Sequence, residues 1–331
     1  MKSILGIGNA LTDILAVLPD DSLLKEYNLP IGSMQHVDAP TGNKIWEKLK
    51  TIGVQYVAGG SAANTISATS IFGMPSGFIG KVGDDELGSL FRQAQQQNGI
   101  KSNLLLGRAA SGRAMVFITA PNADRTFATY LGAALELGPD DLKDEFFEGY
   151  DYLHIEGYLV QNQRLVRRAV EMGRRHGMQI SLDMASYNVV ESNLTFLHDI
   201  VTNYVDIVFA NETEAKAFTG HEDPRKSLES IARECKIAVV KVGKDGSMVQ
   251  SGDEFHFIEP WPAATIDATG AGDTYAAGFL YAQSMGMPLK VCGEVGSIIA
   301  AKVVEVIGTK IDIPRWKAAK AEIRSKMGIS E

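Results

Sequence analysis

The chain has 331 residues, of which 45% are hydrophobic and 22% charged, and its formal net charge is −8. This composition allows a substantial core and argues against a non-specific nucleic-acid binder, because such a protein needs a basic excess. The cysteines Cys235 and Cys292 lack a CxxC partner, so we expect reduced, buried thiols. We see no apolar window of about 18 residues and no cleavage site after the apolar N-terminal stretch, so we expect a cytoplasmic protein.

Short apolar runs alternate with helical patterns along the chain. Strands are expected at residues 3–7, 77–79, 152–155, 179–183, 207–210 and 237–242. Helices are expected at residues 61–72, 86–98, 163–177, 227–234, 271–285, 290–306 and 316–327. Such alternation is typical of βαβ units, so we predict an α/β fold with a doubly wound, mostly parallel sheet in a single domain spanning residues 1–331.

Two stretches interrupt this alternation, at about residues 14–37 and 113–131. In both, polar and apolar residues alternate as they do in strands, and they contain the turn signals Asp20-Asp21 and Pro121-Asn122. Because two separate strand-like insertions can pair with each other, we expect a small antiparallel sheet over one edge of the domain. We interpret this sheet as a lid.

The sequence DATGAGDT, at residues 267–274, leads directly into a helical pattern. The glycines Gly270 and Gly272 flank Ala271 and allow bare backbone amides to face an anion at the helix N-terminus. An acid at this point, Asp273, makes sense if it takes a proton from a hydroxyl while the amides stabilise a phosphoryl group. The alternative is that Asp273 is simply an N-cap or first-turn acid, which is common at the start of a helix. With two glycines and a second acid at Asp267, we favour catalysis.

Two further motifs suit a polyhydroxylated ligand. In GGSAANT, Gly59 and Gly60 remove side-chain bulk so that a ligand can approach the backbone, and Asn64 offers a donor and an acceptor. In GNALTD, Asn9 and Asp13 follow the first strand, where ligands bind in open α/β sheets. We predict that these residues bind the substrate. The alternative for the first motif is an ordinary turn with Asn64 facing solvent.

The motifs NETEA and KVGKDGS follow two later strands. Asn211 and Glu214 share a face of a first helical turn and could hold water around Mg²⁺, although an N-cap pair is an equally good interpretation. The glycine turn that contains Lys241, Gly243 and Gly246 suits the ribose and phosphates of a nucleotide, with a plain hairpin as the alternative.

Several catalytic motifs are missing from the sequence. There is no GxxxxGK[ST], which excludes a P-loop NTPase, and no HExxH, GxSxG or Cys/His cluster. The GxG at Gly6 and Gly8 lacks a third glycine, which disfavours an NAD-dependent oxidoreductase.

The chain resembles the PfkB (ribokinase-like) carbohydrate kinases over nearly its whole length. Four motifs occur in the family's order and spacing: GGSAAN at 59–64, GKVGDDELG at 80–88, NETE at 211–214 and DATGAGD at 267–273. The resemblance implies a ribokinase-like fold and an ATP-dependent phosphotransferase in which Asp273 is the base and the amides of 270–273 form an anion hole.

The resemblance also implies roles for the other motifs. Asn211 and Glu214 would support Mg²⁺, and residues 241–246 would lie along ATP. Asp13, Gly60 and Asn64 would bind substrate hydroxyls. The loops around Asp267–Thr269 and Val304–Thr309 would match the family's frequent monovalent-cation site, which suggests K⁺.

Within the family, the N-terminal third is most similar to adenosine kinases, through SLLKEYNLPIGSMQHVD and RTFATYLGAALELGPDDL. Glu156 departs from the small residue expected there in eukaryotic adenosine kinases, and it looks more like the acid with which sugar kinases hold a free hydroxyl. An exposed acid at a strand end is the alternative for Glu156.

We therefore expect phosphorylation of a primary hydroxyl of a nucleoside or sugar, with adenosine favoured. A ribose-type or fructose-type sugar kinase, or a non-catalytic ligand-binding homologue, remains the alternative. The expected partner is a small molecule, and the chain is expected to be a monomer or a homodimer formed through the lid, whose exposed edge can pair with another copy.

Overall fold

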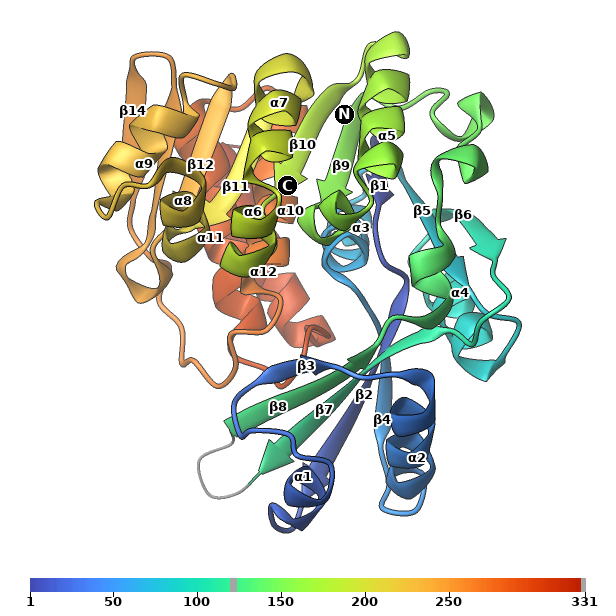
Figure 1. The fold of residues 1–331 in the computed structure, drawn as a ribbon. Helices are drawn as coiled ribbons and strands as arrows, with labels where there is room; N and C mark the ends of the chain where they lie inside the picture. The colour runs from blue at the N-terminus through green and yellow to red at the C-terminus, as the bar shows by residue number, and fades with distance from the viewer. Residues whose placement is uncertain (120–123, 329–331) are drawn as a thin grey trace.

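The computed structural model of the protein describes residues 1–119 and 124–328. The strands of these residues form two sheets, one of nine strands and one of five. In Figure 1 the larger sheet and its helices form the upper body of the molecule, and the smaller sheet lies beneath it. No helix within these ranges is long and apolar enough to cross a membrane. The Pro121-Asn122 turn that the sequence suggests lies outside the described residues.

The larger sheet has the order β14-β13-β12-β11-β10-β9-β1-β5-β6. Neighbours from β6 to β12 pair in parallel, and β12, β13 and β14 pair antiparallel. The strands are β1 (Ile4–Ile7), β5 (Ser76–Val82), β6 (Lys101–Leu106), β9 (Tyr152–Glu156), β10 (Gln179–Asp183), β11 (Ile207–Asn211), β12 (Ile237–Lys241), β13 (Ser247–Ser251) and β14 (Glu254–Ile258). The predicted doubly wound, mostly parallel sheet is confirmed.

Helices cover both faces of this sheet. One face carries α5 (Gln163–Arg175), α6 (Tyr187–Ser192), α7 (Leu194–Tyr204), α8 (Glu212–Thr219) and α9 (Pro224–Ile231). The other carries α3 (Ser61–Ile71), α4 (Glu86–Gln97), α10 (Ala271–Ser284), α11 (Leu289–Val303) and α12 (Ile313–Met327).

Strand β11 is apolar from Ile207 to Ala210 because both faces of the sheet are covered there. Val208 and Ala210 lie in the core on one face of the sheet, and Ile207 and Phe209 lie in the core on the other. Side chains of a strand alternate between its two faces, so a strand covered on both sides needs apolar residues at every position.

The smaller sheet has the order β3-β8-β7-β2-β4 and forms the lid. Its strands are β2 (Leu11–Leu18), β3 (Met34–His36), β4 (Gln55–Gly59), β7 (Gly112–Thr119) and β8 (Asp124–Tyr130), with α1 (Ser22–Glu26) and α2 (Ala39–Leu49) beside them. Ile45 and Leu49 of α2 pack with Ile14 and Phe117 of the sheet in a separate core.

The expected pairing and extent of the lid need correction. β2 pairs in parallel with β7, and β3 with β8, so the sheet is mixed and not antiparallel throughout. Both β2 and β7 run outward from the main body, which makes them parallel, whereas β4 and β8 return and are antiparallel to them. Strand β4 lies outside the expected insertions, and the 14–37 stretch includes the helix α1 as well as strands.

Candidate active site

A cavity of about 1140 Å³ lies where the carboxyl ends of the central strands meet the lid. This edge of an open α/β sheet is where ligands commonly bind, and the volume is ample for more than one small molecule. Most of the sequence-predicted residues line it: Asn9, Asp13, Gly60, Asn64, Glu156, Asn211, Glu214, Lys241, Gly243, Gly246, Thr269, Ala271, Gly272 and Asp273. Gly59, Gly270 and Asp267 do not line the cavity, but each contacts a residue that does.

The first turn of α10 forms one wall of the cavity. Gly270 is the N-cap residue, with φ 75°, a left-handed conformation that favours glycine. A Cβ atom at Gly270 would lie 2.8 Å from Cγ2 of Thr309, so the turn also lacks room for a side chain. The N–H groups of a first helical turn have no intrahelical partner, which makes this wall suitable for an anion.

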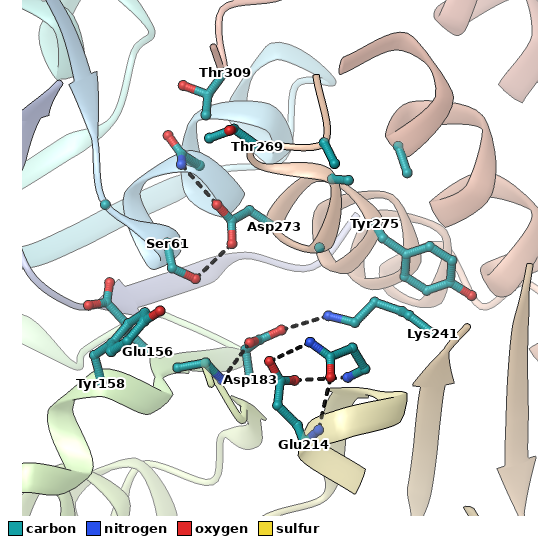
Figure 2. Close-up of a pocket in the computed structure, with 18 of the residues that line it drawn as sticks. Ser61, Glu156, Tyr158, Asp183, Glu214, Lys241, Thr269, Asp273, Tyr275 and Thr309 are labelled. Carbon is teal, nitrogen blue, oxygen red and sulfur yellow. Dashed lines mark hydrogen bonds and ion pairs between the residues drawn. The ribbon is translucent and has the colours of Figure 1, made fainter. Parts of the chain in front are cut away.

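Asp273 lies in that first turn and is held by helix α3. Its Oδ1 accepts a hydrogen bond from Oγ of Ser61 at 2.7 Å, and its Oδ2 accepts one from Nδ2 of Asn64 at 2.9 Å (Figure 2). Burial raises the pKa of Asp273 to about 6, against the lowering effect of the Asn64 hydrogen bond. The carboxylate bonds to α3 and does not cap α10, so neither the capping role for Asp273 nor a solvent-facing Asn64 is observed.

Lys241, at the end of β12, points into the cavity opposite Asp273. Its Nζ lies 3.0 Å from Oδ2 of Asp183, the last residue of β10. Asp183 is absent from the sequence prediction, although its place at the carboxyl end of an expected parallel strand could have drawn attention to it. The glycine turn after Lys241 joins the antiparallel strands β12 and β13, so the hairpin alternative is correct for its conformation, and its residues still line the cavity.

Asn211 and Glu214 form a capping box at the start of α8. Oδ1 of Asn211 accepts from the N–H of Glu214 at 2.9 Å, and Oε2 of Glu214 accepts from the N–H of Asn211 at 2.8 Å. The capping interpretation is therefore observed, and both side chains also line the cavity. Burial, followed by the charge of Asp183, raises the pKa of Glu214 to about 7.

The substrate-side motifs pack tightly against each other. A Cβ atom at Gly59 would lie 2.5 Å from the carboxyl carbon of Asp13, and one at Gly60 would lie 2.2 Å from the carbonyl oxygen of Asn9. Gly60 also has a φ of 98°. These glycines allow the loop after β1 and the start of α3 to approach closely enough to share one side of the cavity.

Glu156, at the end of β9, is buried with only 1% of its surface exposed. Its Oε1 accepts a hydrogen bond from Nδ2 of Asn9, and its Oε2 accepts one from the N–H of Ala62 at 3.2 Å. Burial raises the pKa of Glu156 to about 7, although the Asn9 bond opposes this shift. The prediction of an exposed strand-end acid is wrong.

On the side of the cavity formed by the lid, the wall is largely apolar. The lid and the segments next to it contribute Leu11, Met34, Ala114, Phe127, Leu131, Ala134, Leu135, Leu137 and Leu159 to this wall. Tyr158 lies beside Glu156 (Figure 2), and its burial raises its pKa to about 12. None of these side chains was identified from the sequence, because an apolar residue in a strand does not reveal which side of a lid it faces.

The two loops expected at a monovalent-cation site lie side by side. Oδ2 of Asp267 accepts from the N–H of Gly308 at 2.7 Å, and Oδ1 accepts from Oγ1 of Thr269 at 2.8 Å. The carbonyl of Val304 accepts from the N–H of Asp267 at 3.1 Å. A Cβ atom at Gly308 would lie 3.1 Å from Leu15 of the lid strand β2, so this pair of loops also touches the lid.

Comparison with known proteins agrees with this geometry. The model of the pfkB family carbohydrate kinases matches residues 25–316. An adenosine kinase from Sinorhizobium meliloti has a similar structure, with a TM-score of 0.86, 32% identity, and coverage of 97% of this chain and 99% of the other. A probable sugar kinase from Rhizobium etli gives a TM-score of 0.87 at 29% identity, over 97% of this chain and 99% of the other.

Sequence relatives are named for different activities. A 5-dehydro-2-deoxygluconokinase from Geobacillus thermodenitrificans is 29% identical over 272 residues, which are 77% of this chain and 80% of the relative. An adenosine kinase from Schizophyllum commune is 26% identical and covers 96% of this chain and 97% of the relative. The family match spans most of the chain and includes the cavity motifs at residues 59–64, 211–214 and 267–273. The chain belongs to the pfkB family of carbohydrate kinases.

Proposed function

We propose that the protein transfers the γ-phosphoryl group of ATP to a primary hydroxyl of a nucleoside, with adenosine as the favoured acceptor. The observation that carries the proposal is the buried Asp273 carboxylate in the first turn of α10, held by Ser61 and Asn64 and facing the cavity. A carboxylate with a pKa of about 6 is ionised at neutral pH and basic enough to accept a proton from a hydroxyl as it attacks.

In this mechanism the acceptor hydroxyl lies beside Asp273, and its sugar ring is held by Asp13, Gly60 and Asn64, with Asn9 and Gly59 shaping the same wall. The amides at Gly270, Ala271 and Gly272 offset the charge that develops on the transferring phosphoryl oxygens. The hairpin with Lys241, Gly243 and Gly246 lies along the nucleotide. Closure of the lid excludes water that would otherwise hydrolyse ATP.

The acceptor preference rests on the apolar lid-side wall. A nucleobase is a flat, largely apolar group, and side chains such as Phe127, Leu131 and Met34 offer it a suitable surface next to the sugar-binding residues. A free sugar would leave this wall without a partner.

A free-sugar kinase is the second candidate, because one buried acid favours it. Glu156 lies at the acceptor end of the cavity, where an acid can hold a further sugar hydroxyl. Among the relatives, the 5-dehydro-2-deoxygluconokinases make a sugar acid a specific acceptor to test. However, both oxygens of Glu156 already accept hydrogen bonds from Asn9 and Ala62, which supports a role in holding the loops.

The donor atoms of the cavity fit Mg²⁺ held mostly through water. The described residues contain no group of three or more His, Cys, Asp or Glu side chains that could hold a metal ion. Mg²⁺ commonly keeps several waters and binds substrate phosphates, so Asn211 and Glu214 can support it through its hydration shell. When bound, the ion would offset the negative charge of the ATP phosphates.

We propose that oxygen atoms of Asp267 and Thr269, with carbonyls of the 304–309 loop, bind K⁺ where these two loops lie side by side. We propose that this cation would fix the loop that precedes α10. A rate of ATP consumption that is the same in K⁺, Na⁺ and choline salts would contradict this part of the proposal.

The proposal is tested by measuring ATP consumption with Mg²⁺ and K⁺ against single acceptors: adenosine, other nucleosides, ribose, fructose and 5-dehydro-2-deoxygluconate. We expect the highest kcat/KM with adenosine. A higher value for a free sugar or sugar acid would assign the second candidate. ATP binding without consumption for every acceptor would indicate a non-catalytic homologue.

The Asp273→Asn variant tests the base. It keeps the shape of the side chain and loses its basicity, so turnover should fall by about 10²-fold or more while ATP affinity stays nearly unchanged. Near-normal turnover would exclude Asp273 as the base.

Oligomeric state is part of the same proposal. Strands β3 and β4 are the edges of the lid sheet, and an edge strand can pair with a second copy. Light scattering on the purified protein distinguishes a monomer from a lid-mediated homodimer.

A further inference from the structure

The side chain of Lys241 ends beside the first turn of α10. A Cβ atom at Gly272 would lie 3.0 Å from Nζ of Lys241, so the ammonium occupies space that this glycine leaves open. The Lys241 side chain is only 16% exposed, and it points into the cavity from β12 while Asp273 points into it from α10 (Figure 2). The ammonium is therefore next to the wall on which an anion would bind.

Asp183 fixes the position of this ammonium. Its Oδ2 lies 3.0 Å from Nζ of Lys241, and its Oδ1 accepts a hydrogen bond from the N–H of Ala185 at 2.9 Å. Ala185 has a φ of 66°, a conformation that costs a residue other than glycine about 1–2 kcal/mol. Such strain persists where the surroundings enforce it, often at functional sites. Here the strained turn places the N–H of Ala185 against one oxygen of Asp183, and the other oxygen of Asp183 is left to face Lys241.

Three acids face the Lys241 side chain: Asp183 from β10, Glu214 from α8 and Asp273 from α10. Burial lowers the pKa of Lys241, but the charges of Asp183 and Glu214 more than offset this effect and raise it. The side chain is therefore positively charged at neutral pH. Without it, the buried acids would present only negative charge to a polyphosphate.

We propose that Lys241 is a catalytic residue whose ammonium contacts the γ-phosphoryl group during transfer, and that Asp183 is its positioning residue. This inference rests on the proposed kinase activity and extends it. In the reaction the acceptor oxygen forms a bond to the γ-phosphorus, the bond from that phosphorus to the β–γ bridging oxygen breaks, and ADP leaves with the electron pair. The hydroxyl proton goes to Asp273, while Lys241 stays protonated and donates hydrogen bonds to the phosphoryl oxygens.

The charge of Lys241 also acts on the base. It lowers the pKa of Asp273, against the larger effect of burial. Removing the ammonium would therefore remove a contact to the phosphoryl group and also leave Asp273 protonated to a higher pH. A lysine that only stabilised the fold would still act on Asp273 through its charge, but its loss would remove no contact to the phosphoryl group.

The test compares four variants of the full chain with wild type, using the best acceptor found above. Lys241→Met removes the charge at similar length, Lys241→Arg keeps it, and Asp183→Asn removes the anchor. Lys302→Met is the matched control, because Lys302 is 11% exposed, close to the 16% of Lys241, and its ammonium also lies 3.0 Å from an acid, Glu322, in an ion pair between α11 and α12.

We expect Lys241→Met to lower kcat by about 10²-fold or more, a range typical of losing a group that stabilises transition-state charge. The KM for the acceptor should change by less than about threefold, and the acid limb of the kcat–pH profile should move to higher pH. Lys241→Arg should recover part of kcat, and Asp183→Asn should lower kcat by about tenfold. Lys302→Met should retain kcat and the wild-type pH profile.

Nucleotide binding gives a readout that needs no acceptor. By calorimetry, Lys241→Met should reduce the preference for ATP over ADP by about tenfold relative to wild type, because only ATP carries the γ-phosphoryl group. An unchanged preference, or a kcat within threefold of wild type, would overturn the role of Lys241. A wild-type protein that binds ATP but phosphorylates no acceptor would instead overturn the proposed function.

Discussion

Nδ2 of Asn64 donates a hydrogen bond to Oδ2 of Asp273 across 2.9 Å, and this bond joins helix α3 to helix α10 inside the cavity. The contact links the motif expected to bind substrate with the motif expected to supply the base. Asn64 therefore affects the pKa of Asp273 as well as the proposed binding of the acceptor.

The first prediction concerns the pH dependence of turnover. The base must be ionised, and its pKa is about 6, so kcat should be lost as the pH falls through about 6. Asn64→Leu removes the hydrogen bond that most lowers the pKa of Asp273, so the acid limb should move to higher pH. Ser61→Ala should produce a smaller shift in the same direction. Profiles of kcat between about pH 5 and pH 9 test this, and an unmoved limb in Asn64→Leu would count against Asp273 as the titrating group.

The second prediction concerns stability. The pKa of Asp273 in the folded protein, about 6, is above its ordinary value of 3.8. The folded state therefore binds the proton more tightly than the unfolded chain, so this group favours folding below pH 4 and loses that contribution as the pH rises to about 6. At neutral pH the buried charge costs on the order of 2 kcal/mol.

Asp273→Asn should therefore raise the free energy of unfolding at about pH 8 by roughly 1 kcal/mol or more, while it lowers turnover by about 10²-fold or more. Denaturant titration at pH 8 and at pH 5 is the measurement. The gain should shrink at pH 5, where the wild-type carboxyl is largely protonated. An equal gain at both pH values would mean that the effect does not come from the buried charge.

The third prediction distinguishes two roles of Glu156. If Glu156 holds the loop of Asn9 and the start of α3, Glu156→Gln should raise the KM of every acceptor by about tenfold, because an amide N–H₂ would face a hydrogen-bond donor. The effect should not add to that of Asn9→Ala in the double variant, since both remove the same contact. A KM increase confined to free sugars would show that Glu156 binds a sugar hydroxyl directly.

The fourth prediction compares two glycines that both have a positive φ. Gly60 has a φ of 98° and its Cβ would lie 2.2 Å from the carbonyl oxygen of Asn9, whereas Gly73 has a φ of 85° and nothing within 4 Å of its Cβ. Gly73→Ala should cost about 1 kcal/mol of stability from backbone strain alone. Gly60→Ala adds a steric clash with backbone and should cost at least twice as much, or prevent folding. Equal losses on urea unfolding would contradict the close approach of the two loops.

The α/β architecture was predictable because its signals are local. The run at β12 is β-branched, and the helix α10 begins at a Gly-rich turn, so both could be placed from neighbouring residues alone. The same is true of the glycine-containing site motifs, whose backbone demands are visible in the sequence. Most of the predicted site residues therefore line one cavity.

The lid was predicted less well because its pairing depends on distant segments. Nothing near β2 in the sequence indicates that it pairs in parallel with β7, about a hundred residues later. Strand β4 was missed since QYVAG is short and ends in the glycines already assigned to the substrate motif. Asp183 was missed because its importance comes from Lys241, which reaches it only when β10, β11 and β12 lie side by side.

The bond between Ser61 and Asp273 joins residues 212 positions apart in the chain. During synthesis, the lid and the first strands of the main sheet emerge well before α10, so they can pair while the base is still missing. The carboxylate that we propose as the base takes its place only when α10, one of the last helices, packs onto α3, one of the first. A chain released early from the ribosome would therefore contain part of the cavity wall but not the proposed base, and we expect such a fragment to consume no ATP.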